Sequence, residues 1–485
     1  MTIPTERMKG VRASSARSTG PMLALLLIGQ FMAILDVNIV NVALPTLRAD
    51  LHASGASLQL VVAGYIIAYA ALLITGARLG DLLGHRTVFL GGLALFTVAS
   101  LACGLAPTTG FLIVVRFLQG MGAALMTPQV MSMIQRGFQG PARARALSLY
   151  SMVIAGGVVV GQVLGGLLVS ADLLGSGWRL VFLVNVPIGV ALFAAGPRLL
   201  PRADEDRRGG LDPVGLTVLT PALVLLVVPL ILGHELGWPA WGWAALAASA
   251  VLFVVFTLVE RRFAARGGRP LISGRVLRAP GVLVCAFTLL FGPGSWGSFL
   301  FTTTLHLQGD LKMTPLRSGL AFVPCVAAFA VVSLYWQRVP VRWHRRMVPI
   351  GFAIAALGYL WVGPLASGGA AYLALTTVIG FGLGVMPIVM TTALANVPAE
   401  DAADASGLLL TIMQAGQVLG IATSGTLFLV QFENSGSTRH AEYATGWSLA
   451  ALATVAALCA LMMNRRRTTP AADDQAERLS VAVEA

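Results

Sequence analysis

Residues 35–45 read LDVNIVNVALP, and this stretch places Asp36 inside the apolar run Met22–Leu44, which is long enough to span a bilayer. An ionised aspartate at the centre of a membrane helix costs about 2.5–3.5 kcal/mol on insertion scales. The carboxyl group must therefore face a protein interior or a wet cavity where its charge can be compensated or neutralised. We interpret Asp36 as a proton-binding site. A carboxylate that only bonds a neighbouring helix is the alternative.

The composition is that of a protein crossing a membrane many times. Of 485 residues, 56% are hydrophobic and 11% are charged, and the mean hydropathy is +0.81. Soluble domains carry roughly 25% charged residues. The formal net charge is +12, but the basic residues lie in short clusters between apolar runs. That distribution indicates membrane topology and argues against a nucleic-acid partner.

Fourteen apolar runs have about the length that a spanning helix needs. They are Met22–Leu44, Leu58–Thr75, Thr87–Leu105, Phe111–Ile134, Ala146–Val169, Trp178–Leu200, Pro213–Leu232, Trp241–Val259, Gly281–Leu305, Ser318–Trp336, Met347–Leu365, Ala371–Leu394, Gly407–Val430 and Thr445–Met463. With the N-terminus inside, nearly all lysines and arginines fall in inner segments, as the positive-inside rule requires. We therefore expect both termini in the cytoplasm and an uncleaved first helix.

A short internal repeat predicts how these helices are organised. The sequence GQVLG occurs at residues 161–165 and again at 416–420. If the seventh and eighth runs are an inserted pair, the two copies lie in the fifth helix of each six-helix half. Repeated halves with a substrate site between them are common in transporters. The expected division is 1–21 (cytoplasmic tail), 22–200 (first half), 201–280 (linker with the inserted helices), 281–463 (second half) and 464–485 (disordered cytoplasmic tail).

A second intramembrane charge is Arg116, and Gln119 and Gly120 share its helix face because they follow three and four residues later. A permanently charged guanidinium at this depth needs an acceptor. Asp36 is the only carboxylate that we place deep within a span, so we expect it to be the partner of Arg116. Packing through backbone carbonyls is the alternative.

Two further patterns concern glycine. Between the second and third spans, a turn combines glycines with charged residues that can pair on the cytoplasmic side; its residues are Leu79, Gly80, Asp81, Gly84 and Arg86. In the fifth span, Gly157, Gly161 and Gly165 recur every four residues beside Gly166. They form a face without side chains on which another helix can pack closely. A plain packing seam and a functional gate are equally compatible with this spacing.

Taken together, these motifs resemble those of the fourteen-helix drug:proton antiporters of the major facilitator superfamily. Residues 35–45 resemble the family's first-helix motif, 79–86 the superfamily's loop motif, and Arg116, Gln119 and Gly120 the fourth-helix motif linked to proton transfer. The glycines of the fifth span resemble the antiporter motif, although Gln162 stands where proline is frequent. The resemblance implies an all-α major facilitator fold and proton-coupled export of drugs or antibiotics, with Asp36 and Arg116 in proton coupling.

The expected substrate is an amphipathic small molecule that exchanges for protons near the bilayer midplane. Polar residues at suitable depth are the candidates for binding it: Asn41, Tyr65, Gln119, Gln129 and Gln417. Each could equally make an interhelical hydrogen bond. A dedicated exporter of one endogenous metabolite, such as an antibiotic, siderophore or amino acid, is the alternative function.

Other classes of function lack sequence support. Neither lysine, Lys9 or Lys312, belongs to a P-loop, and the histidines form no HExxH-type metal pair. The four cysteines lie within expected spans without metal-ligand spacing. We therefore expect no enzyme activity, metal or cofactor. We expect a protein of a bacterial plasma membrane that functions as a monomer, with the lipid bilayer, a small-molecule substrate and protons as partners.

Overall fold

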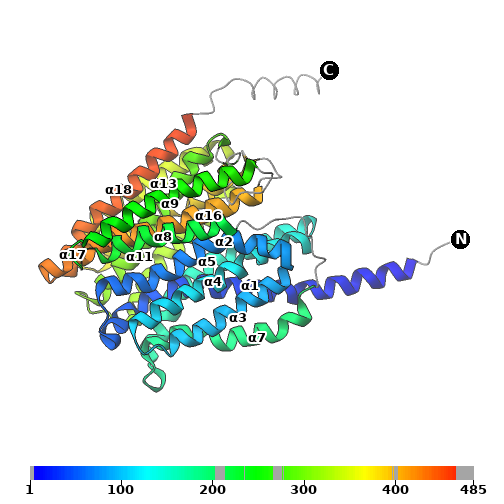
Figure 1. Ribbon diagram of the computed structural model, residues 1–485, viewed down its shortest axis with the longest axis horizontal. Helices are drawn as coiled ribbons and strands as arrows, with labels where there is room; N and C mark the ends of the chain where they lie inside the picture. The colour runs from blue at the N-terminus through cyan, green and yellow to red at the C-terminus, as the bar shows by residue number, and fades with distance from the viewer. Residues whose placement is uncertain are drawn as a thin grey trace.

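All regular secondary structure in the described part of the chain is helical, as predicted. The computed structural model describes residues 5–201, 213–233, 235–265, 276, 278–395, 397 and 402–465. Within these ranges, long helices lie side by side in a bundle (Figure 1). The predicted tail 464–485, except for residues 464 and 465, and most of the linker between 201 and 213 lie outside the described residues.

The helices follow one another through short connections. The first part of the chain contains α1 (Thr5–Leu51), α2 (Gly55–Leu83), α3 (His85–Gly104), α4 (Thr109–Gly137), α5 (Gly140–Ala171), η1 (Leu173–Gly175), η2 (Gly177–Arg179), α6 (Leu180–Leu183), α7 (Asn185–Leu199), α8 (Pro213–Leu232) and α9 (Ala240–Ala265). The second part contains α11 (Val282–Gln308), α12 (Pro315–Tyr335), η3 (Trp336–Arg338), α13 (Val341–Val362), α14 (Ala370–Leu383), α15 (Met386–Leu394), α16 (Ala402–Gly420), the π-helical segment η5 (Ile421–Gly425), α17 (Thr426–Ser435) and α18 (Thr438–Arg465).

Hydroxyl side chains cap several helix starts. The Oγ atoms of Ser54, Thr108 and Thr314 accept hydrogen bonds from backbone N–H groups three residues later, at the first turns of α2, α4 and α12. These N–H groups have no partner within their own helix. The caps therefore fix where three membrane helices begin.

Twelve helices among the described residues are long and apolar enough to cross a membrane. The expected spans Pro213–Leu232 and Met347–Leu365 are not among them, although both regions are helical, as α8 and α13. The number fourteen therefore remains a prediction. Several helices extend beyond the expected spans, and α18, for example, begins at Thr438 rather than near Thr445. This change brings Glu442 into the helix, where it is buried.

The two GQVLG copies lie in equivalent packing seams. In α5, a Cβ atom added at Gly161 would lie 3.2 Å from the carbonyl oxygen of Leu35 in α1. In α16, a Cβ atom added at Gly416 would lie 2.0 Å from the carbonyl oxygen of Leu290 in α11. The first and fifth helices of each expected half thus pack through glycine in the same way. This is the arrangement that an internal repeat predicts.

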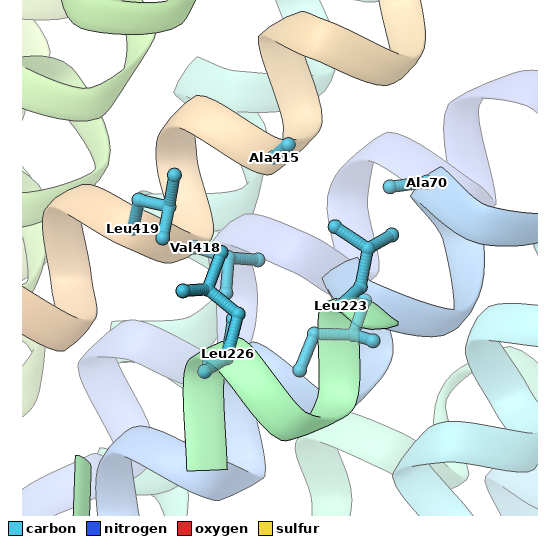
Figure 2. Close-up of a pocket in the computed structure, with 8 residues that line it drawn as sticks. Ala70, Leu223, Leu226, Ala415, Val418 and Leu419 are labelled. Carbon is cyan, nitrogen blue, oxygen red and sulfur yellow. The ribbon is translucent and has the colours of Figure 1, made fainter. Parts of the chain in front are cut away.

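Helix α8 packs between α2 and α16. Figure 2 shows a small cavity where the three helices meet, and every residue that lines it is apolar: Ile67, Ala70, Leu223, Leu226, Val227, Ala415, Val418 and Leu419. The Ser249 hydroxyl donates to the carbonyl oxygen of Ala222 over 2.7 Å and so ties α9 to α8. Because the cavity offers no polar group, it is a packing defect between helices and lacks the features of a polar binding site.

The bundle is tied together at the end where α1 finishes and α2 starts. This end lies to the left in Figure 1, opposite the start of α1 and the end of α18. There, Gln308 Nε2 donates to the carbonyl oxygen of Val42 over 2.9 Å, and the backbone N–H of Leu316 donates to Ser170 Oγ over 3.0 Å. Both bonds join the first part of the chain to the second. We call this end the tied end.

Candidate functional site

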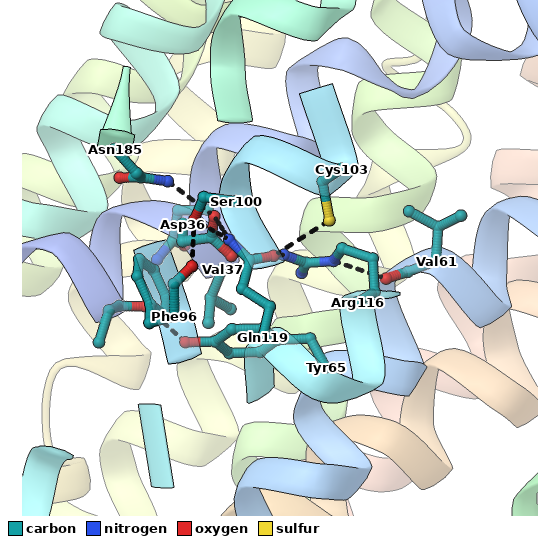
Figure 3. Close-up of polar contacts among 12 residues, drawn as sticks. Asp36, Val37, Val61, Tyr65, Phe96, Ser100, Cys103, Arg116, Gln119 and Asn185 are labelled. Atoms are coloured by element: carbon teal, nitrogen blue, oxygen red, sulfur yellow. Dashed lines mark hydrogen bonds and ion pairs between the residues drawn. The ribbon is translucent and has the colours of Figure 1, made fainter. Parts of the chain in front are cut away.

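A buried ion pair joins α1 to α4. Asp36 and Arg116 are 0% and 1% exposed, and Arg116 Nη1 donates to Asp36 Oδ2 (Figure 3). The other carboxylate oxygen of Asp36 accepts from Gln119 Nε2 over 2.7 Å and from Asn185 Nδ2 over 3.1 Å. Three donors from α4 and α7 therefore surround one carboxylate from α1. We call these four residues the ion-pair cluster.

The guanidinium of Arg116 has neutral contacts as well. Its Nε donates to the carbonyl oxygen of Val61 over 3.0 Å, and its Nη1 also donates to Gln119 Oε1 over 2.7 Å. The guanidinium carbon lies 4.5 Å from the centre of the Tyr65 ring, a cation–π distance. These contacts would still hold Arg116 if the charge on Asp36 were removed, but they would leave its charge without an anionic partner.

Sequence reasoning missed Asn185 and Ser100. Ser100 Oγ accepts from Gln119 Nε2 over 2.8 Å and thereby orients the amide that serves Asp36. Each is a polar residue inside an apolar run, which is a signal for interhelical hydrogen bonding. The distance between each of them and Asp36 along the chain concealed the link.

The stability of the ion-pair cluster depends on the charge of Asp36. The three donors around Asp36 stabilise the ionised form of its carboxyl group. A proton on Asp36 would remove the negative charge that compensates Arg116 in a buried site. Breaking such a pair is strongly unfavourable, by about 3–5 kcal/mol. Protonation would therefore favour a different arrangement of α1 against α4.

A central cavity lies beside the cluster. Its empty volume is about 1030 Å³, its open mouth included. Helices α1, α2, α4, α5, α11 and α16 line it with polar uncharged, aromatic and apolar side chains. The polar and aromatic lining residues are Gln30, Asn38, Asn41, Tyr65, Tyr69, Thr127, Tyr150, Trp296, Gln414 and Gln417. None of the lining residues carries a charge at neutral pH.

Asp36 does not line this cavity, although its neighbours do. Tyr65 lines the cavity while its ring covers the guanidinium of Arg116, and its hydroxyl donates to the carbonyl oxygen of Ala33 over 3.1 Å. Tyr65 is thus a wall shared by the cavity and the ion-pair cluster. On the cavity side, buried oxygens of Gln30 and Asn41 have no hydrogen-bond partner. They are free to accept from a bound molecule.

The predicted binding residues divide between different places. Asn41, Tyr65 and Gln417 line the central cavity. Gln119 belongs to the ion-pair cluster. Gln129 lies near the loop motif, where its Nε2 donates to the carbonyl oxygen of Gly76 over 2.6 Å.

The loop motif holds the start of α3 against α4. Asp81 Oδ1 lies 3.2 Å from Arg136 Nη2 and 3.5 Å from His85 Nε2. A Cβ atom on Gly80 would lie 1.9 Å from Gln129 Oε1, so a larger residue there would displace the Gln129 amide. Gly84, at φ +87°, has a backbone conformation that other residues rarely adopt.

The remaining residues of the loop motif connect it to α7. Arg86 Nη2 donates to the carbonyl oxygen of Pro197 over 2.9 Å, and Leu79 is half-buried in the last turns of α2. The sequence motif therefore describes a fixed connection between four helices.

The glycine face of α5 packs against the stretch that contains Asp36. A Cβ atom on Gly157 would lie 2.9 Å from Cγ2 of Ile34, and one on Gly165 would lie 2.8 Å from the Ile39 carbonyl oxygen. Gly166 faces the opposite way, 2.5 Å by the same measure from the carbonyl oxygen of Pro315 in α12. Helix α5 therefore contacts both parts of the chain. The Gln162 side chain is buried without a hydrogen-bond partner, and the structure does not explain this.

Gly120 makes the corresponding close contact for α4. A Cβ atom there would lie 2.2 Å from the Tyr65 carbonyl oxygen in α2. The fourth-helix motif thus combines a charge, its supporting amide and the glycine that brings α2 close.

No metal centre is present in the described ranges. No group of three or more His, Cys, Asp or Glu residues there could hold a metal ion. All four cysteines are free and buried.

The match to known families accords with this geometry. The model of the Major Facilitator Superfamily matches residues 26–215 and 210–421. The chain belongs to this superfamily of membrane transporters, which move small molecules. With its many apolar helices and bacterial relatives, it is a multi-pass protein of the bacterial plasma membrane.

Several similar proteins are named as transporters or exporters of antibiotics. The chain is 38% identical to the cephamycin export protein of Amycolatopsis lactamdurans, over 87% of each chain. It is 37% identical to a probable actinorhodin transporter of Streptomyces coelicolor, over 84% of this chain and 72% of that one. It is 34% identical to a tetracenomycin C resistance and export protein of Streptomyces glaucescens, over 84% and 75%. The resemblance to drug-efflux members of the superfamily is confirmed by these relatives.

Solved structures agree with the fold. A POT family transporter in complex with a thioalcohol-conjugated peptide gives a TM-score of 0.66 at 15% identity, over 92% of this chain and 96% of that one. A bacterial homologue of the human lysosomal transporter Spinster, in an inward-facing and occupied conformation, gives 0.64 at 16%, over the same shares.

Proposed function

We propose that the protein exports antibiotic-type small molecules in exchange for protons. The observation that carries this proposal is a cavity for a small molecule beside a separate, buried Asp36–Arg116 pair. The names of the relatives, each of which refers to one antibiotic, support the substrate class.

The cavity lining favours an uncharged polar or aromatic substrate. A permanent cation entering the cavity would lose hydration without meeting a carboxylate, which is unfavourable. Amide groups and tyrosines can instead donate and accept hydrogen bonds, and the rings of Tyr69, Tyr150 and Trp296 can stack on a flat molecule. We therefore infer a neutral molecule with aromatic rings and several hydrogen-bonding groups.

The proton would act at Asp36. With the termini in the cytoplasm, the tied end faces outward and the structure represents an outward-closed state. A proton arriving from outside in the opposite state would neutralise Asp36 and release Arg116 to its neutral acceptors, Val61 and Gln119. Return of the proton to the cytoplasm would restore the ion pair. The halves 22–200 and 281–463 would move against each other around the cavity.

Efflux from cells tests this proposal. Cells expressing equal amounts of wild type, Asp36→Asn or Asp50→Asn are loaded with chloramphenicol, which is uncharged, or ethidium, a permanent cation. Asp50→Asn is the matched control because Asp50 lies on the same helix but is about half exposed. We expect chloramphenicol efflux by wild type and the control that stops with a protonophore, and none with Asp36→Asn.

The outcomes separate the parts of the proposal. Full efflux by Asp36→Asn would remove Asp36 from coupling. Efflux of ethidium in preference to chloramphenicol would contradict the inferred substrate class. If wild type exports neither probe, a screen of neutral aromatic antibiotics tests the dedicated-exporter alternative, and export that survives a protonophore would refute proton coupling.

A further inference from the structure

A second buried carboxyl group lies at the tied end of the second part of the chain. Glu442, one turn into α18, is 0% exposed. Neither of its oxygens has a hydrogen-bond partner, and no ion pair among the described residues includes it. Asp36, by contrast, has a cation and two amide donors.

The groups around Glu442 are neutral. The Thr303 hydroxyl of α11 and the Tyr372 phenol of α14 lie near it; both are buried, and neither makes a hydrogen bond to Glu442. Of the helices packed against α18, α11 carries the buried His306, α13 carries the buried Tyr359, and α17 carries the exposed Glu433. The neighbouring cation Arg439, on α18 itself, is exposed at the helix start.

Both ring nitrogens of His306 have hydrogen-bond partners that a neutral ring satisfies. Its Nε2 lies 2.7 Å from the carbonyl oxygen of Ala366, which can only accept, so Nε2 carries the hydrogen. Its Nδ1, 2.9 Å from Thr438 Oγ1, then accepts from that hydroxyl. The same Oγ1 accepts from the backbone N–H of Asp310 over 3.2 Å. This set is complete without a charge on the ring, and no ion pair between His306 and Glu442 occurs among the described residues.

Glu442 must therefore carry a proton in this conformation. An ionised carboxylate that is buried without a cation or donors is penalised by several kcal/mol even after relaxation, so such a group takes up a proton.

The bonds that cover Glu442 belong to the tied end. Asp310, exposed before α12, accepts from Ser437 Oγ over 2.7 Å and from the backbone N–H of Arg439 over 2.9 Å. Partial burial works to raise the pKa of Asp310, but these hydrogen bonds outweigh it and hold the pKa below the usual value of 3.8. Thr438, one helical turn from Glu442, joins the same set. Opening this end would bring water within about 6 Å, one helical turn, of the carboxyl group.

We propose that Glu442 is a proton-binding site whose protonation is required for the tied end to close. Closing buries the carboxyl group and takes up one proton, whereas opening hydrates it and allows the proton to leave. The proposal rests on the proposed function only in assuming that the tied end opens during transport. It adds a second proton-linked step. The site of this step, Glu442, belongs neither to the central cavity nor to the ion-pair cluster.

Infrared difference spectroscopy of the purified full-length protein in lipid nanodiscs tests the protonation directly. We expect a protonated-carboxyl C=O band at neutral pH that shifts in D₂O and disappears at alkaline pH. It should be absent in Glu442→Gln but present in Asp36→Asn and in Glu433→Gln. Glu433 is the matched control because it lies exposed at the same end. A band that persists in Glu442→Gln, or no band in wild type, would overturn the proposal.

A distance measurement tests the link to closure. Spin labels at His52→Cys and Asn434→Cys, both exposed at the tied end, report the separation of the two parts; the four native cysteines are buried. Wild type should open as the pH rises, whereas Glu442→Gln should remain closed at every pH. Equal pH dependence in both proteins would refute the link. Because neither experiment requires a substrate, their results are independent of the efflux test.

Discussion

The ion pair between Asp36 and Arg116 should show strong thermodynamic coupling. In Asp36→Asn, Arg116 keeps the carbonyl oxygen of Val61 and Gln119 Oε1 but loses its only anionic partner. In Arg116→Gln, Asp36 keeps the amides of Gln119 and Asn185. Each single variant leaves an uncompensated buried charge, so we expect each to lower the free energy of unfolding by about 3–5 kcal/mol.

The double variant Asp36→Asn/Arg116→Gln has no buried charge to compensate. Neutral amides at both positions can still exchange hydrogen bonds, so the double variant should lose less stability than the sum of the single variants. We expect a coupling energy of at least about 2 kcal/mol, within the range measured for contacting residues. Denaturant unfolding in detergent micelles, followed by tryptophan fluorescence, measures all four proteins under one condition. Additivity within about 0.5 kcal/mol would refute the buried pair.

Three further predictions concern packing, a buried amide and the tied end. Gly120→Ala would place a Cβ atom 2.2 Å from the Tyr65 carbonyl oxygen and should destabilise by about 1–3 kcal/mol in the same unfolding assay, whereas Gly110→Ala, with no atom within 4 Å, should be nearly neutral. Gln129→Leu removes the side-chain donor to the Gly76 carbonyl oxygen and leaves Nδ1 of the buried His85 without its partner, so it should cost about 1–3 kcal/mol, also by denaturant unfolding; an unchanged midpoint would contradict these hydrogen bonds. The stabilisation from Asp310, whose pKa is lowered, should be present above pH 3.8 and lost as the pH falls further; thermal unfolding of wild type should show this acid-side loss, and Asp310→Asn should lack it.

The sequence was sufficient to predict the pairing of Asp36 with Arg116, because two charges in apolar runs have few partners available. It was not sufficient to place Asn185, since amides are tolerated at many positions in a membrane helix. Gln119 and Gln129 could not be separated from cavity residues by depth and polarity alone. Which face of α4 each one occupies depends on how α2 and α3 pack against it.

The position of Glu442 shows a different limit. Hydropathy locates the apolar centre of a helix well, but helix ends are uncertain by several residues. Glu442 lies within that uncertainty, and the polar residues around it shifted the expected start of the helix to Thr445. Its burial arises where α11 and α13 pack against α18.

Tyr65 has a consequence that extends to how such a transporter diversifies. Its ring is a partition: molecules in the cavity touch one side, and the Arg116 guanidinium lies against the other. If the substrate binds in this cavity and the proton binds at Asp36, as proposed above, the two would not compete for the same atoms. Side chains that line the central cavity can be exchanged one at a time to suit a new molecule while the ion-pair cluster stays unchanged. Transporters for chemically unrelated compounds can arise in this way, with different cavity linings and the same ion-pair cluster.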